Sequence, residues 1–75
     1  MATKTWHSLP EYQALRALME SGTTSKAAIR LGLSQSAVSR SIASLEARTG
    51  RILFEREGGR LRATEEAIRM NRRLD

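Results

Sequence analysis

The 75-residue sequence contains no cysteine, one histidine (His7) and one aspartate (Asp75). Disulfide bonds, iron–sulfur clusters and thiolate zinc sites are therefore excluded, and a reducing compartment is expected. A Ser-His-Asp relay would need the two ends of the chain to meet, which nothing in the sequence indicates. Metal-ligand clusters and phosphate-binding glycine loops are also missing. We therefore expect no enzymatic activity, no metal and no cofactor.

Long apolar runs and aromatic residues are scarce as well. No uncharged apolar run approaches the ~20 residues that a membrane span needs, and no apolar signal region follows the first residues. We expect no membrane segment and a cytoplasmic location. Aromatic residues make up 4% of the chain, against 40% apolar and 28% charged residues. This composition and length are typical of one small globular domain with a helical bias.

Positive charge is abundant. Thirteen basic residues against eight acidic ones give a net charge of +5, and eleven of the thirteen are arginines. Arginine binds phosphate and guanine edges through two parallel hydrogen bonds, so this bias favours a nucleic-acid partner. No acidic residue lies between Glu20 and Glu46, while Lys26, Arg30 and Arg40 do. For charge alone, a soluble surface of arginine–glutamate pairs is the alternative.

Apolar spacing and capping residues predict three helices before residue 50. The first starts at the Ser8–Glu11 capping box, the second ends at Gly32, and the third covers residues 34–49. Only a short glycine-containing turn separates the last two helices, which is the pattern of a helix-turn-helix. Leu33 is expected to fill the corner between them.

The two faces of the 34–49 helix differ in side-chain size. Val38, Ile42 and Leu45 recur at helical spacing and are expected to face the core. The outward face carries small residues and one arginine: Ser36, Ser39, Arg40, Ala43 and Ala47. Small side chains allow a helix to lie deep in a DNA groove, where serine and arginine can hydrogen-bond bases and phosphates. An ordinary solvent-exposed face is the alternative.

After Gly50 the apolar period shortens to that of strands. Two short runs within residues 52–63 predict a β-hairpin, with either Leu53 or Phe54 in the core. The hairpin either contacts a DNA backbone as a wing or merely covers the core. Thr64 and two glutamates then predict the start of a fourth helix. Its apolar stripe consists of Ala67, Ile68, Met70 and Leu74.

Four ordered motifs make residues 9–70 more specific than a bare helix-turn-helix: Ala27-Ala28, Ser34-Gln35-Ser36-Ala37-Val38-Ser39-Arg40, Leu45-Glu46 and Leu53-Phe54-Glu55-Arg56. This stretch resembles the DNA-binding head of LysR-type transcriptional regulators. The resemblance implies a mainly α, winged helix-turn-helix fold, with a three-helix core, a β-hairpin wing and the start of a linker helix. We accordingly assign residues 1–64 to the winged domain and residues 65–75 to the linker or dimerisation helix.

The function implied by the resemblance is sequence-specific binding of double-stranded DNA for bacterial transcriptional regulation. The 34–49 helix would lie in the major groove, and the protein would be cytoplasmic and nucleoid-associated. In the family, the start of the second helix touches the DNA backbone, the third helix contacts bases and nearby phosphates, and a wing arginine reaches toward the minor groove. The implied DNA-binding residues are Thr24, Lys26, Gln35, Ser36, Ser39, Arg40 and Arg60.

The family also carries regions that this sequence lacks. Its linker helix pairs two subunits, and a further domain binds a small-molecule effector. We therefore expect an isolated domain of a larger homo-oligomeric regulator, the alternative being a natural protein of this size. The implied dimerisation residues are Ala67, Ile68, Met70 and Leu74.

Two other classes of function stay open from the residues themselves. A basic RNA-binding or architectural module would need aromatic stacking surfaces or long basic arms. A protein-interaction domain would use the apolar stripe of the fourth helix and would leave Arg40 and Arg60 dispensable.

Overall fold

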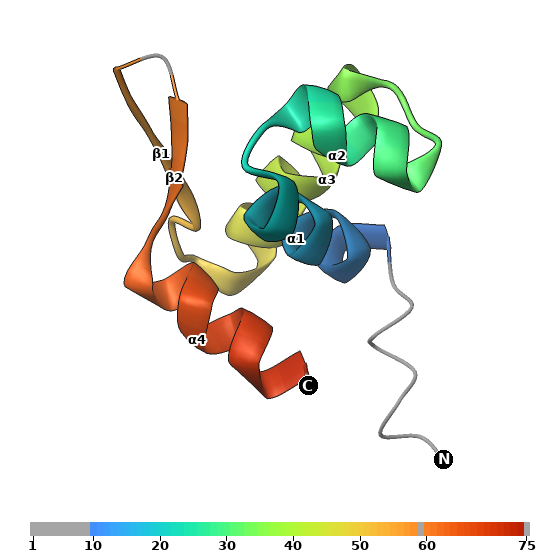
Figure 1. Cartoon of the computed structure of the whole chain (residues 1–75). Coiled ribbons are helices and arrows are strands. Elements are labelled where there is room, and N and C mark those ends of the chain that lie inside the picture. Colours follow the sequence, from blue (N-terminus) through green and yellow to red (C-terminus); the bar gives the residue numbers. More distant parts are fainter. Residues whose placement is uncertain (1–9, 59, 75) are drawn as a thin grey trace.

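A computed structural model describes residues 10–58 and 60–74, excluding the side chains of Arg60 and Leu74. The elements, in chain order, are α1 (Pro10–Ser21), α2 (Thr24–Leu31), α3 (Gln35–Thr49), β1 (Phe54–Glu57), β2 (Arg60–Ala63) and α4 (Glu65–Leu74). Helices α1, α2 and α3 pack against one another, and α4 packs against α1 and β2. Figure 1 shows the hairpin projecting from the helices, with α4 at its base. This arrangement confirms the predicted winged helix-turn-helix fold.

The turn between α2 and α3 has the capping that the sequence predicts. The Thr23 Oγ1 atom accepts a hydrogen bond from Lys26 N at 3.1 Å, and Ser34 Oγ accepts one from Ala37 N at 3.1 Å. Gly32 ends α2 with φ of +70°, in the left-handed region that glycine adopts without a steric cost. These local bonds place the start of α3 close behind the end of α2.

Leu33 does not fill the corner between α2 and α3 as predicted, since 45% of it is exposed. Its backbone closes the corner instead, because Leu33 N donates to Ala28 O at 2.9 Å. The turn is therefore held by backbone hydrogen bonds and not by a buried Leu33 side chain. The small, buried side chains of Ala27 and Ala28 also let α2 approach its neighbours closely.

The first helix is tied to the third by a polar contact. Ser8 of the predicted capping box lies outside the described residues. Glu11 accepts a hydrogen bond from Ser44 Oγ at 2.5 Å and forms an ion pair with Arg48. The carboxylate at the start of α1 thus faces the second half of α3.

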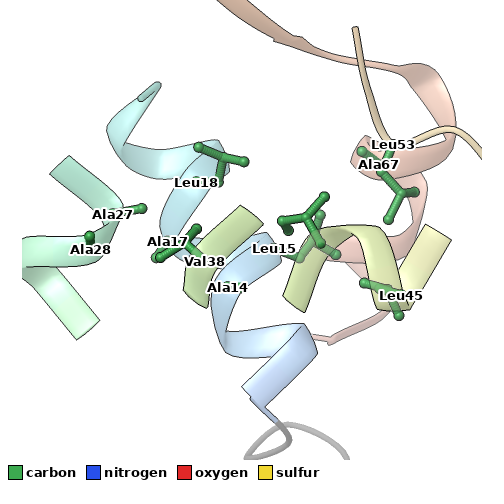
Figure 2. Close-up of a cluster of buried hydrophobic side chains, with 11 residues drawn as sticks. Ala14, Leu15, Ala17, Leu18, Ala27, Ala28, Val38, Leu45, Leu53 and Ala67 are labelled. Carbon is green, nitrogen blue, oxygen red and sulfur yellow. The ribbon is translucent and has the colours of Figure 1, made fainter. Parts of the chain in front are cut away.

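The hydrophobic core joins all four helices and the segment before β1 (Figure 2). Its members are mostly alanine and leucine, and the largest fully buried side chains are those of Leu15, Leu45, Leu53 and Val38. The buried set is Ala14, Leu15, Ala17, Leu18, Ala27, Ala28, Val38, Ile42, Leu45, Leu53 and Ala67. The predicted inward stripe of the third helix is therefore confirmed.

The hairpin has a simple antiparallel register. Phe54 pairs with Ala63, and Arg56 pairs with Leu61. Of the two predicted core residues, Leu53 is fully buried and Phe54 is half-buried against the core. Gly58 has φ of +59°, the positive value that a two-residue hairpin turn requires. Leu61 and Ala63 also pack against the core, so this face of the hairpin points toward the helices.

Helix α4 begins where the sequence predicts. Thr64 caps it, because its Oγ1 accepts a hydrogen bond from Ala67 N at 3.2 Å. Ala67 is fully buried in the core of this chain. Within this chain Ala67 therefore serves the core, and the assignment of the α4 stripe to a dimer interface stays a prediction. Ile68 is 41% exposed and Met70 packs partly against the core, while the Leu74 side chain lies outside the described atoms.

Candidate nucleic-acid interface

The outward face of α3 is built from short polar side chains and one cation. Ser36, Arg40 and Ala43 are exposed on the side of the helix opposite its buried stripe, and Ser39 is exposed on its flank. Because no bulky apolar or acidic side chain interrupts these first turns, the backbone of α3 can approach a partner closely. The face offers serine hydroxyl groups close to the helix backbone and one guanidinium at the end of a long, flexible side chain.

The beginnings of α2 and α3 are linked by side chains. Thr24 Oγ1 donates a hydrogen bond to Gln35 Oε1 over 3.4 Å, across the turn that separates the two helices. Gln35 is exposed, and Thr24 is half-buried. The bond occupies one lone pair of Oε1 and leaves the second lone pair and both Nε2 hydrogens available. A glutamine amide in this state can still pair bidentately with an adenine edge.

A hollow of about 160 Å³ separates these helices from the hairpin. Thr24 of α2, Ser39 and Ala43 of α3, and Arg56 of β1 contribute to its wall. The three elements thus share one surface, and the structure brings together Thr24, Gln35 and Ser39 of the predicted site.

Arg56 is a residue of this surface that the sequence reasoning did not single out. It pairs with Leu61 in the hairpin and lies two residues after Phe54, so it occupies the hairpin face that is turned toward the helices. Strand alternation in the sequence puts Arg56 on the same hairpin face as Phe54. Only the packing of the hairpin shows that this face is turned toward the helices.

Lys26, in the first turn of α2, lies near the end of the hairpin. It lines a second hollow, of about 370 Å³, together with Glu57, Leu61 and Arg62. Lys26 is exposed, and Arg62 is paired with Glu57 at 3.0 Å. The first turn of α2 and the end of the hairpin therefore border the same surface. Arg60 begins β2 opposite Glu57, and its side chain is outside the described atoms, so its predicted contact stays a prediction.

The basic side chains of the described residues include both ion-paired and unpaired ones. Five arginines form ion pairs with glutamates: Arg30 with Glu20, Arg48 with Glu11, Arg51 with Glu66, Arg62 with Glu57, and Arg69 with Glu65 and Glu66. Lys26, Arg40 and Arg56 form no ion pair with any described residue, and all three border the face made by α2, α3 and the hairpin. Arg72 and Arg73, at the end of α4, also form none. Unpaired cations on one face produce a positive potential there that attracts an anionic partner.

The described residues contain neither a metal-binding cluster nor a membrane-spanning helix. Within residues 10–58 and 60–74, no group of three histidine, aspartate or glutamate side chains is arranged to hold a metal ion. No helix in this part of the chain combines the length and apolar character required to cross a membrane.

The sequence of this chain is similar to members of one protein family. Residues 9–68 match the model of the bacterial regulatory helix-turn-helix proteins of the lysR family. The chain is 49% identical over 49 residues to the probable HTH-type transcriptional regulator LrrA of Synechococcus elongatus, which covers 65% of this chain and 17% of that protein. It is 46% identical over 57 residues to the regulatory protein NocR of Agrobacterium fabrum, covering 76% and 19%.

A solved structure shows the same fold. The crystal structure of ArgP from Mycobacterium tuberculosis matches 89% of this chain with a TM-score of 0.80 and 40% sequence identity, over 25% of the ArgP chain. The present chain spans about a fifth of the length of the curated relatives that it matches.

Proposed function

This chain belongs to the lysR family of bacterial regulatory helix-turn-helix proteins, and on that basis we propose that it binds double-stranded DNA sequence-specifically to regulate transcription. Helix α3 lies in the major groove, and the β1–β2 hairpin contacts the adjacent backbone as a wing. The observation that carries the proposal is the surface where the start of α2, the outward face of α3 and the wing meet. Lys26, Arg40 and Arg56 border it, and none of the three has an ion pair within the described residues.

The residues of this surface divide into two roles. Gln35 and Ser36, in the first turn of α3, read base edges, because that turn points into the groove in helix-turn-helix complexes. Lys26 and Arg56 flank the groove and bind phosphates, which set affinity and register without reading sequence. Thr24 orients the Gln35 amide, and Ser39 lies between the residues that read bases and those that bind phosphates. Arg40 serves either a phosphate or a guanine edge, and Arg60 adds a wing contact.

Double-stranded DNA fits this surface better than single-stranded RNA. Sequence-tolerant binding of single strands relies on aromatic side chains that stack on bases. Phe54 packs against the core, and Tyr12 is half-buried in α1. The described residues therefore present no exposed aromatic platform. Competition between duplex DNA and single-stranded RNA distinguishes the two partners.

The function is tested by a salt titration. A preferred duplex is first selected from a random DNA pool, and its affinity is compared with that of a scrambled duplex. We expect tighter binding to the selected duplex and a linear fall of log K with log salt for both. Equal affinity for the two duplexes at every salt concentration would contradict sequence-specific binding.

Substitutions of Gln35 and Lys26 should have different effects. Gln35→Ala should reduce discrimination between the selected duplex and one changed at the contacted base pair, by about 1–3 kcal/mol. Lys26→Ala should weaken binding to both duplexes alike and lower the salt slope by about one. Fluorescence anisotropy with matched duplexes measures both quantities. A uniform loss for Gln35→Ala would assign it a phosphate rather than a base.

The properties of a longer protein follow the family and are also proposals. We infer that a full-length homo-oligomer forms through the region of α4, where Ile68 is exposed and available for a partner. A small-molecule effector would bind a domain outside this chain. We further propose a cytoplasmic, chromosome-bound location and no enzymatic activity.

A further inference from the structure

The Glu46 carboxylate connects α3 to the base of the hairpin. Its Oε2 atom accepts a hydrogen bond from Leu53 N at 2.8 Å and another from Phe54 N at 3.3 Å. Glu46 is only partly exposed and lines the hollow shared with Ser39 and Arg56. Its negative charge is thus used within the chain, on two backbone amides that lie at the start of the wing.

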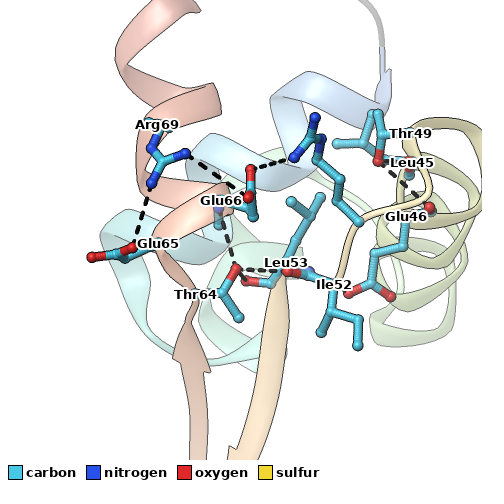
Figure 3. A network of polar contacts seen from close by, with 11 residues as sticks. Leu45, Glu46, Thr49, Ile52, Leu53, Thr64, Glu65, Glu66 and Arg69 are labelled. Atoms are coloured by element: carbon cyan, nitrogen blue, oxygen red, sulfur yellow. Dashed lines mark hydrogen bonds and ion pairs between the residues drawn. The ribbon is translucent and has the colours of Figure 1, made fainter.

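A second set of bonds holds the same segment from the opposite side. Thr64 Oγ1 donates to Ile52 O at 2.6 Å, and Thr64 N donates to Leu53 O at 2.9 Å. Figure 3 shows the Glu46 and Thr64 side chains reaching this segment from different directions. Thr64 ties the segment to α4, whereas Glu46 ties it to α3. Among the hydrogen bonds of the described residues, those that join the start of the wing to the helix proposed to enter the major groove are the two accepted by Glu46.

The Glu46 bonds also determine the position of Arg56. This residue follows Phe54 by two positions along β1 and occupies the same face of the hairpin. Fixing the Phe54 amide to α3 therefore fixes where Arg56 lies relative to Ser39 and Arg40. We propose that Glu46 is a positioning residue, which sets the wing against α3 so that Arg56 and the α3 face contact the same stretch of DNA. This inference rests on the proposed DNA-binding function.

Whether removal of the Glu46 side chain weakens or tightens DNA binding distinguishes a positioning role from charge repulsion. A carboxylate beside a DNA-binding surface repels phosphates, so removing its charge alone should tighten binding. If Glu46 positions the wing, removing its side chain should weaken binding despite the lost repulsion. A glutamine at this position lacks the charge but keeps an oxygen that can accept the same two hydrogen bonds.

The experiment compares Glu46→Ala, Glu46→Gln, Arg56→Ala and the double variant Glu46→Ala/Arg56→Ala on the selected duplex. Glu46→Ala should raise Kd roughly tenfold and lower the salt slope by about one, as Arg56→Ala does. The double variant should bind no more weakly than Arg56→Ala, because both changes remove the same contact. Glu46→Gln should bind at least as tightly as the unchanged chain.

Glu55→Gln is the matched control for charge. Glu55 is exposed on β1, and its side chain has no hydrogen bond or ion pair within the described residues. Its substitution removes the same charge from the wing without touching the anchor, so binding should be unchanged or tighter. Additive losses for Glu46→Ala and Arg56→Ala, or unchanged binding of Glu46→Ala, would overturn the proposal.

Two further measurements keep the test decisive. Far-UV circular dichroism establishes that each variant is folded at the assay temperature. Should Glu46→Ala not fold, Glu46→Asp carries the same test, because its carboxylate keeps the charge but is one methylene shorter. Amide hydrogen exchange at Leu53 and Phe54 should accelerate in the anchor variant without DNA. If the unchanged chain shows no duplex preference, the proposed function fails, while unaltered exchange at both amides separately rejects the anchor.

Discussion

Replacement of Leu45 by alanine is expected to lower the free energy of unfolding by about 3 kcal/mol. Leu45 is one of the four largest fully buried side chains and lies on the inward stripe of α3. The substitution removes apolar contacts and leaves a cavity that the surrounding helices close only in part. A domain of this size has a total stability of about 4–11 kcal/mol, so the loss is a large fraction of it.

Urea unfolding followed by far-UV circular dichroism measures this effect. Ile29→Ala is the matched control, because it removes the same number of carbon atoms from a helix position that is 80% exposed. Its free energy of unfolding should change by no more than about 0.5 kcal/mol. A similar loss for both variants would show that the Leu45 side chain of α3 is not buried in the core.

Reversal of the charge at Arg40 should produce the largest loss of DNA binding from a single residue. Arg40 is exposed on the outward face of α3 and has no ion pair within the described residues. Arg40→Glu removes a favourable contact and places a carboxylate where phosphates or base acceptors approach. We expect roughly a hundredfold weaker binding at moderate salt, since juxtaposed like charges cost several kcal/mol.

Arg72→Glu provides the control for total charge. Arg72 is exposed near the end of α4, and its reversal changes the net charge by the same two units. Its effect on affinity should be several-fold at most and should fade as salt screens the interaction. Equal losses for the two variants would indicate non-specific attraction. Unchanged binding by Arg40→Glu would favour a protein-interaction domain, in which this arginine is dispensable.

Local chemistry explains why so much of the fold could be predicted. Thr23, Ser34 and Thr64 cap helices because the side-chain oxygen of each accepts a hydrogen bond from the amide three residues later. Gly32 and Gly50 end helices in the left-handed conformation for an equally local reason. These signals depend on neighbours in the chain, so they can be read before any tertiary contact is known. The buried stripe of α3 follows from helical spacing in the same way.

Expectations that depended on distant neighbours were less secure. Ala67 matched the stripe of a dimerisation helix, but α4 packs on its own domain and encloses that residue in the core. Leu33 has an apolar side chain beside a turn, and backbone bonds close the turn without it. In both cases the sequence supplied the chemical character of the residue. The contacts that decide whether it is buried come from elements elsewhere in the chain.

The sequence by itself therefore determined the order of the helices, their ends, the inward stripe of α3 and the family, because each is carried by residues close together along the chain. Tertiary structure alone decided that Arg56 faces the helices and that the Glu46 carboxylate holds the wing. Hydrogen bonds between segments seven or eight residues apart, across a change from helix to strand, depend on the angle at which those segments pack. Spacing does not encode that angle, and the relative placement of α3 and the wing depends on it.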